Sequence, residues 1–364
     1  MDIGIPAEQP NEYRVGLTPQ GVSLLTQRGH RCFVQRGAGE GAGFPDISYE
    51  RAGARIAYAA EEVYSRADLV LKVGATTPDE VPLLREGQTI CAFWHLSAQP
   101  REIVYALLKH NISAVSYELI QEPDGHLPVL RPLSEIAGRM APQIAARWLQ
   151  NDGGGSGMLI GGLPGIPPID VAIIGAGVVG LNAARAFLGL GGRVLVLDKD
   201  LARLQIIDEQ YKGQIVTMVS HDFNVARVAR FADVLVGAVL EPGERAPIVV
   251  TREMVSSMRP RSVIIDISID QGGCVETSRP TTHDNPIFFE EDVIHYCVPN
   301  MPGVVARTAT HAYLNAAWPY IQQLAGLGTP EAVEADPALR RGVVVHDGEI
   351  TNDTLALLLE EAGA

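Results

Sequence analysis

Short apolar runs alternate with segments of helical periodicity along the first third of the chain. Runs of apolar residues are typical of buried strands, and apolar residues repeated every three or four positions are typical of helices. Strands are expected at residues 2–6, 31–37, 54–58, 68–74, 89–96 and 113–120, with helices at 18–30, 48–54, 60–67 and 99–111. Because this alternation indicates parallel βαβ units, we expect a first α/β domain over about residues 1–130.

The same alternation returns in the middle of the chain. Residues 132–150 have helical spacing and predict a long connecting helix, and the glycine-rich residues 151–168 lead from it into the next strand. Strands are expected at residues 171–175, 193–198, 214–219, 233–240 and 262–268. This second unit is expected to end near residue 305, and the segment from residue 310 onward has a helical pattern.

Residues 171–200 carry the most informative motif of the chain. Gly175, Gly177 and Gly180 form G-x-G-x-x-G between an apolar strand and a helix, and Asp198 closes the following strand. In a dinucleotide site the glycines permit a tight turn, close approach of a pyrophosphate and close helix packing. The motif predicts bound dinucleotide at these glycines and at Val178 and Val179; the alternative is a glycine-rich turn in another kind of α/β protein.

The acid at the end of the second strand bears on the choice of cofactor. A carboxylate at Asp198 can accept hydrogen bonds from the ribose hydroxyls of NAD, and it would repel the extra phosphate of NADP. We therefore expect NAD. The fold expected is α/β, with two Rossmann-like domains built on parallel sheets. In it an NAD-binding domain, residues 131–305, is inserted into a discontinuous substrate domain made of residues 1–130 and 306–364.

Composition narrows the class of protein. The 364 residues carry a formal net charge of −14, which argues against a nucleic-acid surface. The first ten residues lack the pattern of a signal peptide, and prolines, glycines and Asp170 interrupt the apolar tract at 158–190, so we expect neither export nor a membrane span. The four cysteines are scattered, which favours a reduced cytoplasmic protein with buried thiols and no metal site.

Three basic side chains in the first domain could serve chemistry on a small anionic substrate. Lys72 lies near the end of an apolar strand, where ligands bind in such sheets, although it could also reach out to solvent. His95 follows the next strand and could exchange a proton, although a lone histidine is more often structural. Arg14, in a loop, could bind a carboxylate, although most loop arginines are merely solvated.

Two further segments of the second domain hold polar side chains after a strand. Asp270 is expected at the end of the strand around residues 262–268, beside a glycine pair, whereas Asp266 lies deeper and is expected to be a structural hydrogen-bonding acid. Asn300 and Met301 occupy a turn after another strand and could line a nicotinamide site. Turn formation is the rival explanation for this segment.

Together these segments resemble the alanine dehydrogenase branch of the alanine dehydrogenase and nicotinamide nucleotide transhydrogenase family. The resemblance runs from residue 3 to about residue 350, and two of its motifs, DQGGCVETSRPTTH and LSEIAGRM, are absent from a generic Rossmann enzyme. The other motifs are NEYRVGLTP, GAGEGAGFPD, DLVLKV, HLSAQP, IGAGVVGLNAA, GAVLEPG, REMVSSM and HYCVPNMPG.

The resemblance implies a role for each matching residue. Arg14 and Lys72 correspond to contacts of the pyruvate carboxylate and carbonyl, His95 to the general acid–base and Asp270 to a second catalytic residue. Asn300 and Met301 match positions beside nicotinamide and substrate. The implied cofactor contacts are Ser134 at the phosphate or nicotinamide, Asp198 at the ribose, Arg203 and Ser220 on the adenosine side, and Val239, Leu240 and Arg279 elsewhere.

The activity implied is reversible oxidative deamination of L-alanine to pyruvate and ammonia with NAD, in a homo-oligomer that family members commonly form as a hexamer. The sequence departs from the family pattern at Ala7, at Gly74–Thr76 and at Val305–Thr308. Because Gly74–Thr76 directly follows the Lys72 segment, a dehydrogenase of another amino or oxo acid stays open. So do an NAD-binding component of a transhydrogenase and a non-catalytic NAD sensor.

Overall fold

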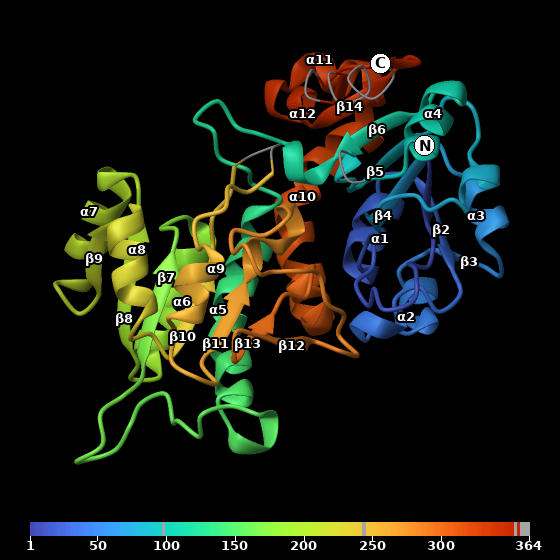
Figure 1. The fold of residues 1–364 in the computed structure, drawn as a ribbon. Helices are drawn as coiled ribbons and strands as arrows, with labels where there is room; N and C mark the ends of the chain where they lie inside the picture. The colour runs from blue at the N-terminus through green and yellow to red at the C-terminus, as the bar shows by residue number, and fades with distance from the viewer. Residues whose placement is uncertain (97–98, 242–244, 353–354, 357–364) are drawn as a thin grey trace. The chain divides into compact units, whose positions relative to one another are not determined.

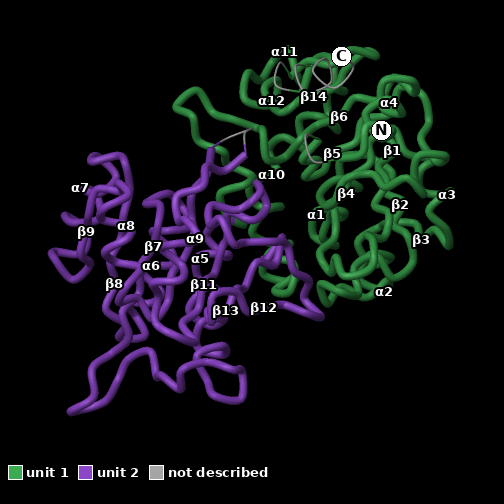
Figure 2. The backbone as a smooth tube through the Cα atoms, in the orientation of Figure 1, with its two compact units in different colours: residues 1–133, 303–364 green, residues 134–302 purple. Residues whose placement is uncertain are grey.

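The computed structural model describes residues 1–96, 99–241, 245–352 and 355–356. The chain divides into two compact units, residues 1–133 with 303–364 (unit 1) and residues 134–302 (unit 2), which Figure 2 shows in different colours. Parts of three predicted segments lie outside the described residues: positions 97–98 of HLSAQP, positions 242–243 of GAVLEPG, and most of the last dozen residues of the tail.

Unit 1 is built on an eight-stranded sheet in the order β15-β14-β6-β5-β4-β1-β2-β3 (Figure 1). The strands are β1 (Asp2–Ile5), β2 (Arg31–Gln35), β3 (Arg55–Ala57), β4 (Leu69–Gly74), β5 (Thr89–Phe93), β6 (Ser113–Ser116), β14 (Val343–His346) and β15 (Glu349–Ile350). Strands β1 to β6 pair in parallel, and β14 and β15 add an antiparallel edge. The helices are α1 (Pro19–Thr26), α2 (Asp46–Arg51), α3 (Ala60–Arg66), α4 (Arg101–Lys109), α10 (Ala306–Leu327), α11 (Thr329–Ala335) and α12 (Pro337–Gly342).

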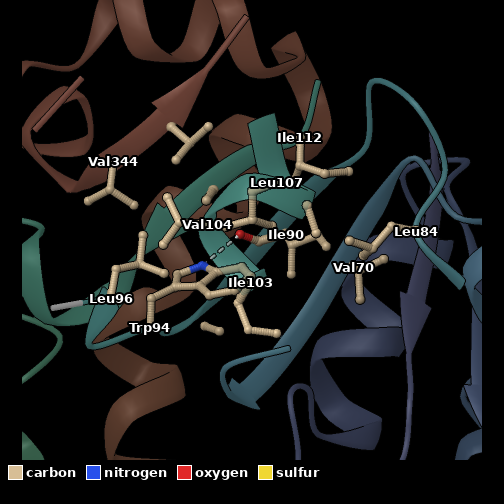
Figure 3. Close-up of a cluster of buried hydrophobic side chains, with 14 of the residues drawn as sticks. Val70, Leu84, Ile90, Trp94, Leu96, Ile103, Val104, Leu107, Ile112 and Val344 are labelled. Carbon is tan, nitrogen blue, oxygen red and sulfur yellow. Dashed lines mark hydrogen bonds between the residues drawn. The ribbon is translucent and has the colours of Figure 1, made fainter. Parts of the chain in front are cut away.

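A core of buried side chains lies where β5 and α4 meet (Figure 3). Trp94 is fully buried in it among Ile103, Val104 and Leu107 of α4, and its indole N–H donates to the carbonyl oxygen of Ile90 at 3.3 Å. Burying a large aromatic ring with its one polar atom satisfied is favourable. This core therefore fixes the chain that leaves β5.

Unit 2 is built on a seven-stranded sheet in the order β12-β13-β11-β10-β7-β8-β9. The strands are β7 (Asp170–Ile174), β8 (Arg193–Asp198), β9 (Val216–Val219), β10 (Val234–Gly237), β11 (Val263–Asp266), β12 (Ile287–Glu290) and β13 (Val293–Tyr296). All pairs are parallel except that of β12 with β13. The helices are α5 (Arg131–Trp148), which begins three residues before the unit does, α6 (Val178–Gly189), α7 (Leu201–Tyr211), α8 (Asp222–Ala229) and α9 (Arg252–Ser256).

Two glycines let α6 approach its neighbours closely. A Cβ on Gly180 would lie 1.8 Å from the carbonyl oxygen of Gly175, and a Cβ on Gly138 of α5 would lie 2.4 Å from that of Val179. Gly175 itself has φ +108°, a conformation that side chains disfavour. The absence of side chains at these positions therefore sets how α6 packs on β7 and on α5.

The predicted α/β class with two Rossmann-like sheets is confirmed, with three corrections. The segment from residue 310 onward is not helical throughout, because β14 and β15 lie in it. The sheets are mostly parallel rather than wholly so, because antiparallel strands extend one edge of each. Several strands also end earlier than predicted: β11 ends at Asp266 and β6 at Ser116, and each is followed by a short 3-10 helix, Ile267–Gln271 and Tyr117–Leu119. Apolar residues continue into these turns because the turns are buried, so hydrophobicity alone extends the strands too far.

We expect Gly180→Ala to lower the free energy of unfolding by about 3 kcal/mol, since the added methyl group collides with backbone that cannot move aside. Gly189→Ala is the matched control: it lies at the end of the same helix, and its Cβ would meet nothing within 4 Å. Urea unfolding followed by circular dichroism measures both. Equal stability of the two variants would contradict this account of the packing.

Candidate functional site

The glycine turn of unit 2 is held by the acid at the end of β8. The buried Asp198 carboxylate accepts the backbone N–H of Ala176 through Oδ2 at 2.6 Å and that of Asp200 through Oδ1 at 2.8 Å. These bonds tie the end of β8 to the turn between β7 and α6. The carboxylate and the glycine backbone therefore occupy one place at the carboxyl edge of the parallel strands, where ligands bind in open α/β sheets.

The start of α6 has the properties of an anion site. Among the described residues no side chain caps this terminus, and the first backbone N–H groups of a helix have no partner within the helix. A Cβ on Gly177 would meet nothing within 4 Å, so the space beside the turn is open. Backbone donors, the helix dipole and this open space fit a pyrophosphate, and Asp198 fits the ribose hydroxyls of a dinucleotide.

Other residues expected to hold a cofactor cluster around the same strand ends. Arg203 lies 3.9 Å from Asp198 and 3.5 Å from Asp200, measured between guanidinium nitrogen and carboxylate oxygen. Ser220 follows β9 and donates its backbone N–H to the carbonyl oxygen of Asp198 at 2.9 Å. Val239 and the exposed Leu240 follow β10, and the Val239 N–H donates to Ser268 Oγ at 2.9 Å.

Ser134 and Arg279 lie elsewhere in unit 2. Ser134 is in the first turn of α5. Arg279 is exposed, and its guanidinium carbon lies 4.2 Å from the centre of the Phe288 ring, a cation–π contact. Their roles toward a cofactor stay predictions.

Asp270 lies in the 3-10 helix after β11, not at the end of the strand as predicted. It is exposed, and its Oδ1 accepts the backbone N–H of Asn300 at 2.9 Å. Asn300 has φ +54°, and Met301 beside it is almost fully buried. The structure therefore brings together Asp270 and Asn300, which lie 30 positions apart in the sequence.

The loop that carries Asp270 is organised by Asp266, as predicted for a structural acid. The buried carboxylate of Asp266 accepts backbone N–H groups of Ser268 at 3.1 Å, Cys274 at 3.0 Å and Val275 at 3.2 Å. Burial raises the pKa of Asp266 above its ordinary value, and these hydrogen bonds oppose the rise. Asp266 thus closes the loop on both sides of Asp270.

In unit 1, His95 lies two residues beyond β5, with half of its side chain exposed (50%). Its backbone is left-handed, with φ +44°, and its N–H donates to Oε1 of Glu118 at 2.6 Å. The imidazole Nδ1 lies 3.8 Å from the same oxygen. Sequence reasoning did not single out Glu118; the available signal was an acid inside the strand predicted at residues 113–120.

Lys72 is fully buried (0% exposed), which excludes the alternative that its side chain reaches solvent. Its ammonium forms a very short ion pair with Glu80 Oε1, which also accepts the hydroxyl of Tyr64 at 3.1 Å. The other oxygen of Glu80 accepts the N–H of Thr77 at 2.8 Å. A buried cation needs such a partner, and Glu80, which carries no sequence motif, was missed.

A second carboxylate also lies near Lys72. Glu8 accepts the backbone N–H groups of Val73 at 2.6 Å and Gly74 at 3.1 Å. Burial raises the pKa of Glu8, and the charge of Lys72 works against that rise. Gly74, one of the residues that depart from the family pattern, is therefore in direct contact with the surroundings of Lys72.

Arg14 is buried in unit 1, which excludes the alternative of a merely solvated loop arginine. Its Nε donates to Glu12 Oε1 at 2.8 Å, and its Nη2 to Glu12 Oε2 at 2.5 Å. Burial disfavours the charged guanidinium, but the hydrogen bonds and charge of Glu12 outweigh this and raise the pKa of Arg14. Arg14 is thus a fixed cation, held by a bidentate pair.

Two family models together match nearly the whole chain. The model of the N-terminal domain of "Alanine dehydrogenase/PNT" matches residues 4–137, and that of its C-terminal domain matches residues 141–353. Alanine dehydrogenase of Halomonas elongata is 46% identical over 98% of this chain and 96% of its own.

Solved structures agree with these matches. A structure of L-alanine dehydrogenase superposes with a TM-score of 0.95 at 40% identity, covering 99% of each chain. The transhydrogenase of Sinorhizobium meliloti superposes with a TM-score of 0.82 at 25% identity, covering 96% of this chain and 100% of its own. The chain therefore belongs to the alanine dehydrogenase/PNT family.

Proposed function

We propose that this chain is an NAD-dependent alanine dehydrogenase, which catalyses the reversible oxidative deamination of L-alanine to pyruvate and ammonia. The observation that carries the proposal is likeness over nearly the whole chain to proteins of that activity. Arg14, Lys72, His95 and Asp270 are all present, which disfavours a non-catalytic NAD sensor.

In this proposal the cofactor site lies in unit 2. Unit 2 binds NAD through the start of α6 and the Asp198 carboxylate, as the open glycine turn supports. Ser134, Arg203, Ser220, Val239, Leu240 and Arg279 are the further cofactor contacts proposed. When bound, NAD accepts the hydride from the α-carbon of alanine. The residues proposed to act on substrate are Arg14, Lys72, His95, Asp270, Asn300 and Met301.

The cations orient the substrate and the acid–base residues move its protons. Arg14 and Lys72 hold the carboxylate and carbonyl oxygens, and Glu12 and Glu80 keep the two cations in place. His95, through its ring nitrogen, and Asp270, through its carboxylate, take up protons as water adds to the imine carbon and ammonia leaves. Positioning of this kind can lower a barrier by about 7–11 kcal/mol in favourable cases.

One observation favours a second candidate, a dehydrogenase of a different amino or oxo acid. Gly74 replaces the charged residue expected at this position and contacts Glu8, which lies beside Lys72. A changed segment at this point can alter the room for the substrate side chain. As for a transhydrogenase component, no helix among the described residues is long and apolar enough to cross a membrane.

We also propose that the enzyme is cytoplasmic and assembles as a homo-hexamer. The four cysteines are buried and free, which fits a reducing compartment. The hexamer is proposed from the family resemblance, and light scattering of the purified chain measures it.

A screen of oxo acids with ammonium and NADH tests the proposed reaction. Pyruvate is expected to be the best substrate by kcat/KM, with the reverse reaction seen from L-alanine and NAD. The change in NADH absorbance measures both. Preference for a larger oxo acid would support the second candidate, and NADH binding without turnover of any oxo acid would overturn the assignment as an enzyme.

His95→Gln and Asp270→Asn are each expected to lower kcat by about 10²- to 10⁴-fold, because a positioned general acid or base usually accelerates a reaction by that factor. NADH binding, measured by fluorescence titration, is expected to persist. His126→Gln and Asp152→Asn are the matched controls, because both residues are exposed and lie outside the proposed machinery. Near-normal turnover of either test variant would remove that residue from the mechanism.

A further inference from the structure

We propose that Glu118 is a positioning residue for His95, holding its backbone and ring so that one edge of the imidazole is presented to substrate. The proposal rests on the proposed function of His95 as acid–base, and it names the group through which unit 1 fixes that side chain. Its basis is a set of contacts within unit 1.

The sheet brings the two residues together. Strands β5 and β6 are parallel neighbours in the sheet, with Ala92 opposite Ser116. Each strand ends within one residue of this pair. The segments that follow β5 and β6 therefore both leave the sheet at the same edge. His95 lies three residues beyond Ala92 and Glu118 two residues beyond Ser116, which places the two side by side.

The Glu118 carboxylate clamps the turn that carries His95. Its Oε2 accepts the backbone N–H of Trp94 at 3.2 Å and its Oε1 accepts that of His95 at 2.6 Å, so two consecutive peptide groups are bound by one side chain. Glu118 is buried, with 7% of the residue exposed. Hydrogen bonds to a buried carboxylate are strong because the acceptor is charged and water competes little.

This clamp matters because His95 has a backbone conformation that its side chain disfavours. A residue other than glycine at φ +44° is strained, so it keeps this conformation only where its surroundings hold it there. Two contacts hold this turn. The Trp94 side chain is buried in the core of unit 1 (Figure 3), and Glu118 accepts the backbone N–H groups of Trp94 and His95. Strain of this kind at a reactive side chain is typical of functional sites, where it fixes the direction of the side chain.

The ring of His95 lies beside the same carboxylate. Nδ1 of His95 lies 3.8 Å from Glu118 Oε1, so the Nδ1 edge of the ring faces the clamp. Nε2 is on the opposite edge, and the side chain is 50% exposed. The arrangement therefore presents Nε2, and Glu118 acts on the reaction through His95 without itself touching substrate.

The test is a double-mutant cycle between Glu118 and His95. Glu118→Gln keeps the shape but offers an amide NH₂ where one backbone N–H needs an acceptor, so the turn should loosen. We expect kcat to fall roughly 10- to 100-fold, a loss typical of groups that orient a functional imidazole. KM values for alanine and NAD should stay within about threefold, because the proposed carboxylate and cofactor contacts are untouched.

The same change in a His95→Gln background should cost nothing further, since the residue through which Glu118 acts is gone. Glu118→Asp, which keeps the charge but shortens the reach, should give a smaller loss with the same dependence on His95, and it serves if the glutamine variant does not fold. Glu122→Gln is the matched control: Glu122 is in the same unit and accepts the hydroxyl of Tyr320.

Two results would overturn the proposal: unchanged kcat in both Glu118 variants, or an equal loss with and without His95. The second result would mean a role in stability alone. Neither result affects the proposed function. That proposal would be contradicted by a different measurement, namely no turnover of alanine by the unaltered chain.

Discussion

Close contact between backbone groups at the glycine turn of unit 2 is the constraint on which the rest of the proposed cofactor site depends. Helix α6 can start where it does only because Gly180 has no side chain to collide with the carbonyl of Gly175. Asp198 then fixes the turn by accepting the Ala176 N–H. Without this contact, the start of α6 and the Asp198 carboxylate would not be held together at one edge of the sheet.

Carboxylates that accept backbone N–H groups recur at the strand ends of both units. In unit 2, Asp198 closes the glycine turn and Asp266 closes the loop of Asp270. In unit 1, Glu118 binds the turn of His95, and Glu8 binds the end of β4 after Lys72. Parallel strands end with backbone groups that lack partners in the ladder, and a buried acid satisfies two or three of them at once. Three of these acids thus hold the backbone next to a proposed reactive residue: Asp266 near Asp270, Glu118 at His95 and Glu8 at the residue after Lys72.

The sequence predicted the parts of this fold that have strong periodicity or a motif. The glycine turn, the connecting helix at α5 and the structural role of Asp266 followed from residue type and spacing. The antiparallel edge strand β12 was missed because its four residues, Ile287–Glu290, are too few to show a strand periodicity. For Lys72 the sequence left open whether the side chain is buried or reaches solvent, because its partner Glu80 lies in a loop without a motif. Pairings such as Asp270 with Asn300 depend on the sheet order, which local pattern does not specify.

A crystal structure with NAD bound tests the central claim most directly. The account predicts the pyrophosphate against the backbone N–H groups at Gly177–Val179, with the adenosine ribose hydroxyls donating to the Asp198 carboxylate. A pyrophosphate bound away from the start of α6, or a ribose with no contact to Asp198, would contradict it.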